Sequence, residues 1–232
     1  MYRILTASKD TYITDKIVSN TFRANDANVG RASTLDLFKL YGESSSGSVE
    51  NPIEVSRVLV KFDLDPIRAL TSSILDLGSS TFKAFLRMSD VYGGQTTPEN
   101  FKLIVFPLSQ SFDEGSGRNI IDYSDLGSCN YVTASVTSGT PTLWFLSGAN
   151  KQGFLGSNDI DIIGSGNLSD GKGDRFLWSS QTFKTGEEDL KVDVTDIISG
   201  TIAGQIPDHG FRVSYSGSFE TNQKTYFVKR FS

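Results

Sequence analysis

The feature that most constrains the fold is an alternation of apolar and polar side chains with a period of two. It is clearest in residues 55–64, where Arg57, Lys61 and Asp63 lie on the face opposite a row of apolar side chains. This pattern predicts half-buried β-strands, which must pair with one another, so a mostly antiparallel β-protein is expected. The apolar series are Val58, Val60, Phe62 and Leu64; Phe82, Ala84, Leu86 and Met88; and Phe211, Val213 and Tyr215.

Strand signals are distributed over both halves of the chain and are separated by turn-rich stretches. Glycine, proline and asparagine cluster in these stretches, as they do in surface loops. The predicted strands are residues 2–6, 35–41, 55–64, 81–91, 101–108, 143–146, 190–194, 211–216 and 225–231. The predicted loops are residues 42–51, 92–100, 111–127 and 147–173.

Helix is predicted in only two short segments. Asp65 precedes Pro66, a favoured residue type at the first helical position, so residues 65–70 are expected to form one or two turns. Residues 193–199 are the second segment. Its candidate N-caps are Asp193 and Thr195, and its candidate stops are Gly200 and Gly204.

The order of these elements predicts the fold class. Long loops without crossover helices join the strands, which excludes βαβ units and favours an all-β, two-sheet antiparallel β-sandwich with a jelly-roll-like topology. With 16 phenylalanines, the chain has enough bulky apolar surface to fill the space between two sheets. Residues 1–232 are predicted to form a single domain. The alternative is two smaller β domains that meet between residues 109 and 142.

Charge and composition exclude several classes of partner. The net charge is −5, so a surface that neutralises nucleic-acid phosphates is not expected. No signal-like or membrane-spanning apolar run is present, and the protein is expected to be made and folded in a cytoplasm. Cys129 is the single cysteine, so no intrachain disulfide can form, and it is predicted to be buried and structural.

The sequence lacks the residues of a recognisable catalytic or metal site. The single histidine, His209, lies in a turn before a strand, and Cys129 has no flanking base to lower its pKa. The oxygen-rich loop 167–174 lacks the spacing of a calcium loop and is interpreted as simple turns. We therefore predict no enzyme activity, no cofactor and no metal ligand. The acidic pairs considered for glycoside hydrolysis are Asp113 with Glu114, Asp159 with Asp161, Glu187 and Glu188 with Asp189, and Asp193 with Asp196.

Several segments, in this order, resemble the DNRLRE-type β-sandwich domains. The resemblance covers most of the chain and implies a β-sandwich. The segments that carry it are ASKDTYI at 7–13, NVG at 28–30 with STL at 33–35, SRVLVKFDL at 56–64, DVT at 193–195 and GFRV at 210–213.

Within this group the chain is most similar to structural proteins of contractile-tailed, marine-type bacteriophages. The resemblance implies a non-enzymatic virion component of the head, neck or tail surface that binds other virion proteins. Relatives continue past the last segment into a strand that closes the sandwich, so either the record is truncated or a neighbouring subunit covers this edge. The carrying segments are residues 106–117, 204–212 and 224–231. The predicted partner-binding residues are Tyr226, Phe227, Val228, Lys229, Arg230 and Phe231.

Two alternative functions are compatible with the same fold. A carbohydrate-binding module, for example for host-surface glycans, would stack sugar rings on exposed aromatic side chains. A glycan-cleaving tail enzyme would need two carboxylates in working geometry. The aromatic candidates are Trp144, Trp178, Tyr92, Tyr123 and Tyr131, of which Trp144 lies in an apolar run that is expected to be core.

Overall fold

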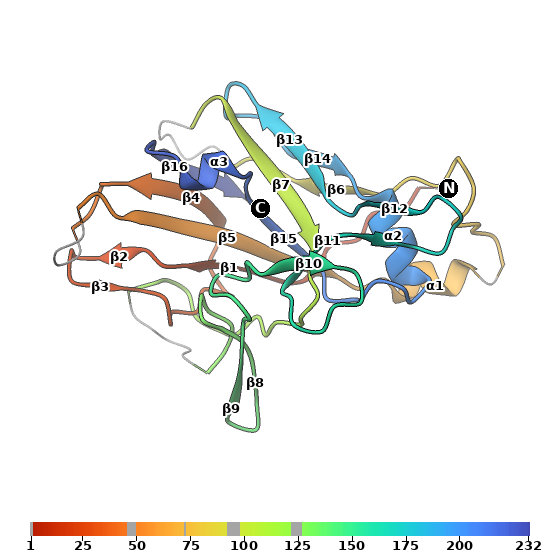
Figure 1. Ribbon diagram of the computed structural model, residues 1–232, viewed down its shortest axis with the longest axis horizontal. Coiled ribbons are helices and arrows are strands. Elements are labelled where there is room, and N and C mark those ends of the chain that lie inside the picture. The colour runs from red at the N-terminus through yellow and green to blue at the C-terminus, as the bar shows by residue number, and fades with distance from the viewer. Residues whose placement is uncertain (1, 46–49, 72, 92–97, 122–126) are drawn as a thin grey trace.

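The computed structural model describes residues 2–45, 50–71, 73–91, 98–121 and 127–232. In these residues the largest sheet has seven strands, drawn from both halves of the chain, and it is curled (Figure 1). The strands are β1 (Ala7–Thr14), β4 (Leu35–Tyr41), β5 (Ile53–Phe62), β7 (Phe101–Pro107), β13 (Ser179–Phe183), β15 (Phe211–Tyr215) and β16 (Tyr226–Phe231). Their order is β13–β7–β15–β5–β4–β16, and β1 also pairs with β5.

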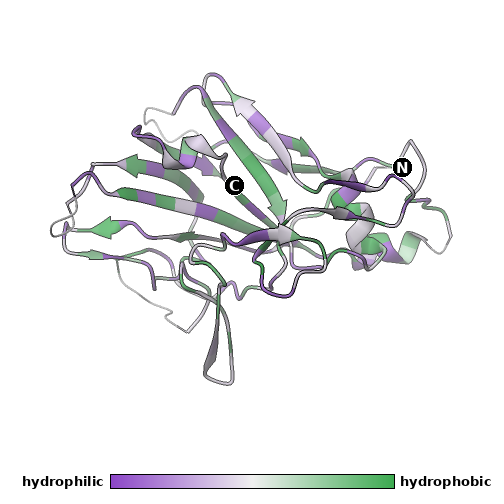
Figure 2. Ribbon diagram, in the orientation of Figure 1, coloured by the Kyte–Doolittle hydropathy of each residue, from purple (hydrophilic) through white to green (hydrophobic). Residues whose placement is uncertain are grey.

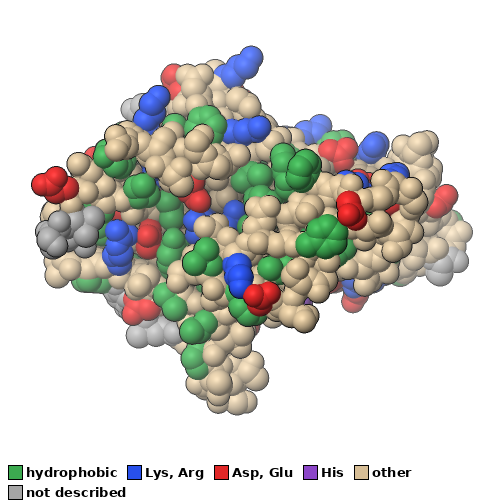
Figure 3. Space-filling model, in the orientation of Figure 1, with side chains coloured by type: hydrophobic (Ala, Val, Ile, Leu, Met, Phe, Trp, Pro, Cys, Tyr) green, Lys and Arg blue, Asp and Glu red, His purple; other side chains and the backbone are tan. Residues whose placement is uncertain are grey.

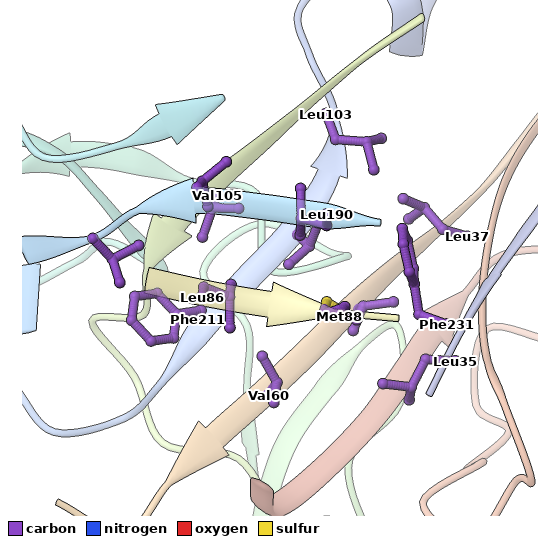
Figure 4. Packing of buried hydrophobic residues seen from close by; sticks show 14 of the residues in the cluster. Leu35, Leu37, Val60, Leu86, Met88, Leu103, Val105, Leu190, Phe211 and Phe231 are labelled. Atoms are coloured by element: carbon purple, nitrogen blue, oxygen red, sulfur yellow. The ribbon is translucent and has the colours of Figure 1, made fainter. Parts of the chain in front are cut away.

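A second layer packs on one face of this sheet. It is an antiparallel ribbon of β6 (Phe85–Met88) and β14 (Leu190–Asp193). Leu86 and Met88 of β6 lie above Val60 of β5 in one apolar cluster (Figure 4). Burial of each such side chain contributes about 1.5–3 kcal/mol to stability. The predicted all-β antiparallel sandwich is therefore confirmed.

The other face of the large sheet is also covered, which the alternating pattern did not predict. Leu59 of β5 and Phe106 of β7 join an apolar cluster with residues from 108 to 162. Polar residues are interspersed among apolar ones along β5 (Figure 2), yet Leu59 is fully buried and Arg57, on the same face, is only 4% exposed. The prediction that Arg57 lies on a solvent face is wrong, because a polar side chain can be buried where partners satisfy it.

Those partners of Arg57 come from three separate segments. Its Nε and Nη2 atoms donate to the two carboxylate oxygens of Glu220 at 2.8 and 2.9 Å, and Nη1 donates to the carbonyl of Gly148 at 2.8 Å. The guanidinium also lies 5.7 Å from the centre of the Tyr131 ring. A bidentate ion pair of this kind replaces water with matched hydrogen bonds and allows the charge to be buried.

The predicted loop at residues 147–173 is wrong, because it contains two strands. A bulky side chain at Gly164 would clash with its neighbour, since a Cβ there would lie 2.1 Å from Nε2 of Gln152. Close packing therefore explains the glycine in this strand, whereas the sequence had indicated a turn. The two strands are β10 (Gln152–Phe154) and β11 (Ile162–Asn167), and β12 (Asp174–Phe176) begins directly after the predicted loop. β10 pairs parallel with β11, and β11 pairs antiparallel with β12.

Two predicted strands are also wrong. Residues 2–6 form no strand, and the first long strand is β1. The hairpin of β8 (Thr133–Thr137) and β9 (Thr140–Leu143) projects from the body (Figure 1), and of the run 143–146 it includes Leu143 alone. Trp144 of this run is buried, as predicted, but its three apolar neighbours are exposed. A second short hairpin joins β2 (Ile17–Val18) to β3 (Phe22–Arg23).

The two predicted helices are confirmed and a third was missed. α1 (Asp65–Thr71) and α2 (Thr195–Ile202) match the predicted segments, and α3 (Ser218–Thr221) is a single turn before β16. Val194 occupies the N-cap position of α2 without a side-chain cap, so neither predicted N-cap is correct. Gly204 has a φ of +74° just beyond this helix, as expected for a stop.

Candidate functional site

The predicted partner-binding strand, β16, is largely integrated into the fold of its own chain. It pairs antiparallel with β4, with a bulge between Tyr226 and Lys229. Tyr226, Lys229 and Phe231 are buried, Val228 and Arg230 are half-buried, and Phe227 is 53% exposed. Of the predicted residues, Phe227 therefore offers the largest free side-chain surface, and the other five mainly support the strand.

Lys229 is the anchor of β16. Its ammonium donates to the Asp90 carboxylate and, at 2.7 Å, to the carbonyl of Gly186. It also lies 5.7 and 5.2 Å from the centres of the Phe183 and Phe231 rings. A buried ammonium is stable only with such partners, so this contact fixes β16 against the segment that contains Asp90.

The end of β16 is paired on its second side as well. The amide of Ser89 donates to the carbonyl of Ser232, and the amide of Ser232 donates to the carbonyl of Ser89, both at 3.1 Å. The amide of Val91 donates to the carbonyl of Arg230 at 3.1 Å. The edge that the sequence had indicated as exposed is thus covered by residues 89–91 of the same chain.

The open edge lies on β6, directly before the paired residues 89–91. The amide of Val194 donates to the carbonyl of Ala84 at 2.9 Å, and hydrogen-bonding residues alternate along an antiparallel strand. Ala84, Leu86 and Met88 therefore direct their backbone groups toward β14. Phe85 and Arg87 direct theirs to the opposite side, where no described residue bonds them.

The far edge of β14, by contrast, is closed by side chains of β13. The Gln181 side chain donates from Nε2 to the backbone carbonyl of Asp189. Its Oε1 accepts from the backbone amide of Lys191, and both distances are 2.7 Å. Ser179 donates its hydroxyl proton to the carbonyl of Asp193. One glutamine thus substitutes for a ladder partner, and only the β6 side of the ribbon is left open in the described structure.

A second exposed surface is the projecting hairpin β8–β9. Ser138 and Gly139 at its tip have φ values of 51° and 80°, as a two-residue type I′ turn requires. Pro141 lacks an amide proton, and the amide of Val136 is held by Oδ2 of Asp113 at 2.7 Å. Both outer edges of the hairpin are therefore less able to pair with another strand.

Aromatic side chains form a row across the three-stranded sheet. Phe154 pairs with Ser165, which pairs with Phe176, so the three side chains point to the same face. Phe154 is 45% exposed and Phe176 is 73% exposed. The Phe176 ring lies 5.4 Å from the half-buried ring of Trp178. Hydrophobic side chains are visible on this face of the molecule (Figure 3).

A groove of about 780 Å³ adjoins this row between β12, α2 and residues 77–83. Arg175 binds Asp170 through both carboxylate oxygens, at 2.7 and 2.9 Å, and Asp196 at 2.9 Å. The hydrogen bonds from Arg175 lower the pKa of Asp170 to about 2. The charged side chains that line the groove cancel in sign; they are Lys83, Lys172, Arg175, Asp170, Asp193 and Asp196.

The other predicted aromatic candidates lie elsewhere. Trp144 is buried and donates from Nε1 to the carbonyl of Asn130 at 3.0 Å. Tyr131 is half-buried under Arg57. Tyr92 and Tyr123 lie outside the described residues.

Eight of the nine acidic residues considered for catalysis have structural partners. Asp161 is buried and accepts amide hydrogen bonds from Phe145, Leu146 and Lys151 at 2.8, 3.0 and 2.8 Å. Asp159 forms an ion pair with Lys151 at 2.5 Å. These contacts give both carboxylates a structural role in the turns between residues 145 and 161.

The remaining acidic candidates are arranged in the same way. Asp113 accepts from an amide of β8, and Oε1 of Glu114 accepts from the amide of Asp10 at 2.9 Å. Glu188 accepts from three amides of its own turn, while Asp189 pairs with Arg87 at 2.8 Å. In the described parts of the chain these carboxylates hold turns and strand ends.

His209 and Cys129 offer no activated nucleophile in this fold. Burial lowers the pKa of His209, which lies in the turn before β15. Burial raises the pKa of the Cys129 thiol well above its ordinary value, and the residue is fully buried, as predicted. Among the described residues no cluster of three or more His, Cys, Asp or Glu side chains could hold a metal ion. None of the helices in the described ranges is long and apolar enough to cross a membrane.

Comparisons with known proteins add no relative to this picture. No protein-family model matches the chain, and no curated protein is significantly similar to it. The resemblance to DNRLRE-type domains and to bacteriophage structural proteins therefore stays a prediction.

Proposed function

We propose that the chain is a non-enzymatic bacteriophage virion structural protein that acts through protein–protein contacts at the head, neck or tail surface. It would be synthesised and assembled in the host cytoplasm. The observation that carries this proposal is the open backbone edge at Phe85 and Arg87, next to Ser89, which pairs with Ser232 just after β16.

An open strand edge favours assembly for a physical reason. Unpaired amide and carbonyl groups in a row form a template for another strand, and monomeric proteins usually blunt such rows. This chain blunts the hairpin β8–β9 with Pro141 and closes β14 with Gln181, yet leaves β6 open within the described structure. Strand addition at such an edge gives affinity through main-chain hydrogen bonds.

Exposed apolar side chains offer a second type of contact. Leu143, Phe145 and Leu146, at the base of the hairpin, are 54%, 48% and 52% exposed. Interfaces place apolar and aromatic side chains of this kind at their centre.

Purified virions test the proposal. Mass spectrometry and high-resolution imaging should find the chain at a fixed copy number with density assigned to it. Recovery of the chain only as a free monomer from infected-cell lysate, with none in the virion, would contradict the proposal.

Carbohydrate binding is the second candidate function, and the row formed by Phe154, Ser165 and Phe176 favours it. The two exposed rings are separated by two strand spacings, or roughly 10 Å, and sugar rings stack on such faces. Retention on a polysaccharide column should be lost in Phe176→Ala and Trp178→Ala but kept in Phe227→Ala, which removes a ring from another part of the surface. Equal retention of all three variants would exclude this face.

A further inference from the structure

The segment at residues 2–6 has the properties of a strand without a partner. Tyr2 is 86% exposed and Ile4 is 75% exposed, the two largest values among the exposed large hydrophobic side chains of the described chain. Tyrosine, isoleucine and threonine alternate along it at positions 2, 4 and 6, and these residue types favour strands. An exposed apolar segment of this type is costly unless something covers it.

The same chain also holds the matching edge. Phe85 and Arg87 present amide and carbonyl groups on the outer side of β6, beyond the point where Ser89 is paired with Ser232. A strand added there would pair with β6 on the side where the end of β16 already pairs with residues 89–91. It would widen the second layer of the sandwich. The exposed Phe85 side chain, at 52%, would gain a neighbour on the outer face of this layer.

No described backbone hydrogen bond joins residues 2–6 to β6 of the same chain. The backbone groups of Phe85 and Arg87 are therefore left for a strand of another copy.

We propose that residues 2–6 of one copy add as a strand to the open β6 edge of a second copy. The proposal rests on the assembly function above and names its contact. Each copy supplies both halves of the interface, so reciprocal exchange would close a symmetric pair, while one-way exchange would build a ring or filament. The added strand bonds the outward backbone groups of Phe85 and Arg87.

The central test uses cysteine pairs in the full chain. The native Cys129 is fully buried, so a short bismaleimide should not cross-link the wild-type protein. The Ile4→Cys, Phe85→Cys double variant should give a covalent dimer. A mixture of the two single variants should also give a dimer, because each then supplies one half of the contact. A cross-link confined within one chain would overturn the exchange between copies.

Association measured by analytical ultracentrifugation supplies the second readout. Ile4→Pro removes strand pairing from an exposed segment outside every described sheet, and Ile4→Thr is its matched control because threonine retains the amide and favours strands. The proline variant should weaken association at least tenfold, and the threonine variant should not. Arg87→Pro should also abolish association, with Phe85→Pro as a second edge variant in case the first unfolds. Mixing Ile4→Pro with Arg87→Pro should restore a one-to-one pair.

Different results would overturn the strand exchange and the assembly function. Virions that contain the wild-type chain and both proline variants in equal amounts would overturn the strand exchange and leave the assembly function intact. A wild-type chain that is monomeric at every concentration would also overturn the exchange. Absence of the wild-type chain from virions would overturn the assembly function itself.

Discussion

The two edges of the β6–β14 ribbon differ in hydrogen bonding: the β14 edge is closed and the β6 edge is open. On the β14 side, Gln181 and Ser179 of β13 hydrogen-bond the outward backbone groups, and the ribbon is tied to the large sheet. On the β6 side, the outward backbone groups of Phe85 and Arg87 have no partner among the described residues, although Ser89 and Val91 are paired with the end of the chain at Arg230 and Ser232. Protection of a sheet edge is therefore local. One side chain can close an edge, and two residues with unpaired backbone groups can leave a binding site for another strand.

Lys229 fixes β16 against the segment that contains Asp90, where the paired part of the edge ends and the open part at Arg87 and Phe85 begins. Lys229→Ala removes a buried ammonium and leaves the nearly buried Asp90 carboxylate without its cation. Loss of one partner of a buried pair costs about 3–5 kcal/mol, so we expect the largest fall in the free energy of unfolding here. Urea denaturation measures it, and the exposed Lys224→Ala is the control. A change equal to that of Lys224→Ala would show that Lys229 does not anchor the strand.

Opening the closed edge should have a smaller effect. Gln181→Ala removes the two hydrogen bonds that close β14 and exposes its backbone groups to water. We expect a loss of about 2 kcal/mol, at about 1 kcal/mol for each bond. The neighbouring exposed residue supplies the control, Thr182→Ala. In Gln181→Ala, the amide of Lys191 should exchange rapidly with solvent. Continued protection of that amide would contradict the role assigned to Gln181.

The turn that joins β13 to β14 predicts an acid-sensitive contribution. Partial burial raises the pKa of Glu188, but the backbone hydrogen bonds that it accepts in this turn, including those from Lys184 and Thr185, outweigh burial and lower the pKa from 4.5 to about 2. A depressed carboxylate pKa stabilises the fold above pH 4.5, and this contribution is lost as the pH falls toward 2.

Solvent screening makes the contribution of Glu188 modest, at about 1 kcal/mol or less. Stability measured between pH 6 and pH 2 should fall more steeply in the wild type than in Glu188→Gln. Parallel curves for the two proteins would contradict the assignment.

Arg87→Gln should have the smallest effect on stability. The Arg87 side chain is 66% exposed, and its ion pair with Asp189 is screened by solvent. Glutamine retains the backbone amide of the open edge, so both the free energy of unfolding and the strand contact should be unchanged within error. A clear loss of association in this variant, matching that of Arg87→Pro, would assign the contact to the side chain and not to the backbone edge.

The sequence predicted the regular strands of the sandwich better than it predicted the site. Alternation correctly placed Leu86 and Met88 inside and Arg87 outside, because β6 has one buried face. It failed for Arg57, whose burial depends on Glu220, a residue far along the chain. A period of two records only which side chains share a face and cannot show that both faces are covered.

The candidate site illustrates the same limit. The resemblance predicts partner binding at residues 226–231, whereas the open edge lies beside the end of this strand and belongs to β6. Which backbone groups remain unpaired depends on the hydrogen-bond phase of a ladder, and no residue type encodes that phase. The residue types at positions 2–6 predict an ordinary strand of the sandwich, whereas Tyr2 and Ile4 are exposed and this segment belongs to no described sheet.

Amide hydrogen exchange at β6 tests the open edge most directly. In the isolated chain at low concentration, the amides of Phe85 and Arg87 should exchange rapidly, while those of Leu86 and Met88 stay protected by β14. In the assembled protein, Phe85 and Arg87 should become protected as well. Protection of these two amides in the isolated monomer, or rapid exchange in the assembly, would contradict the account.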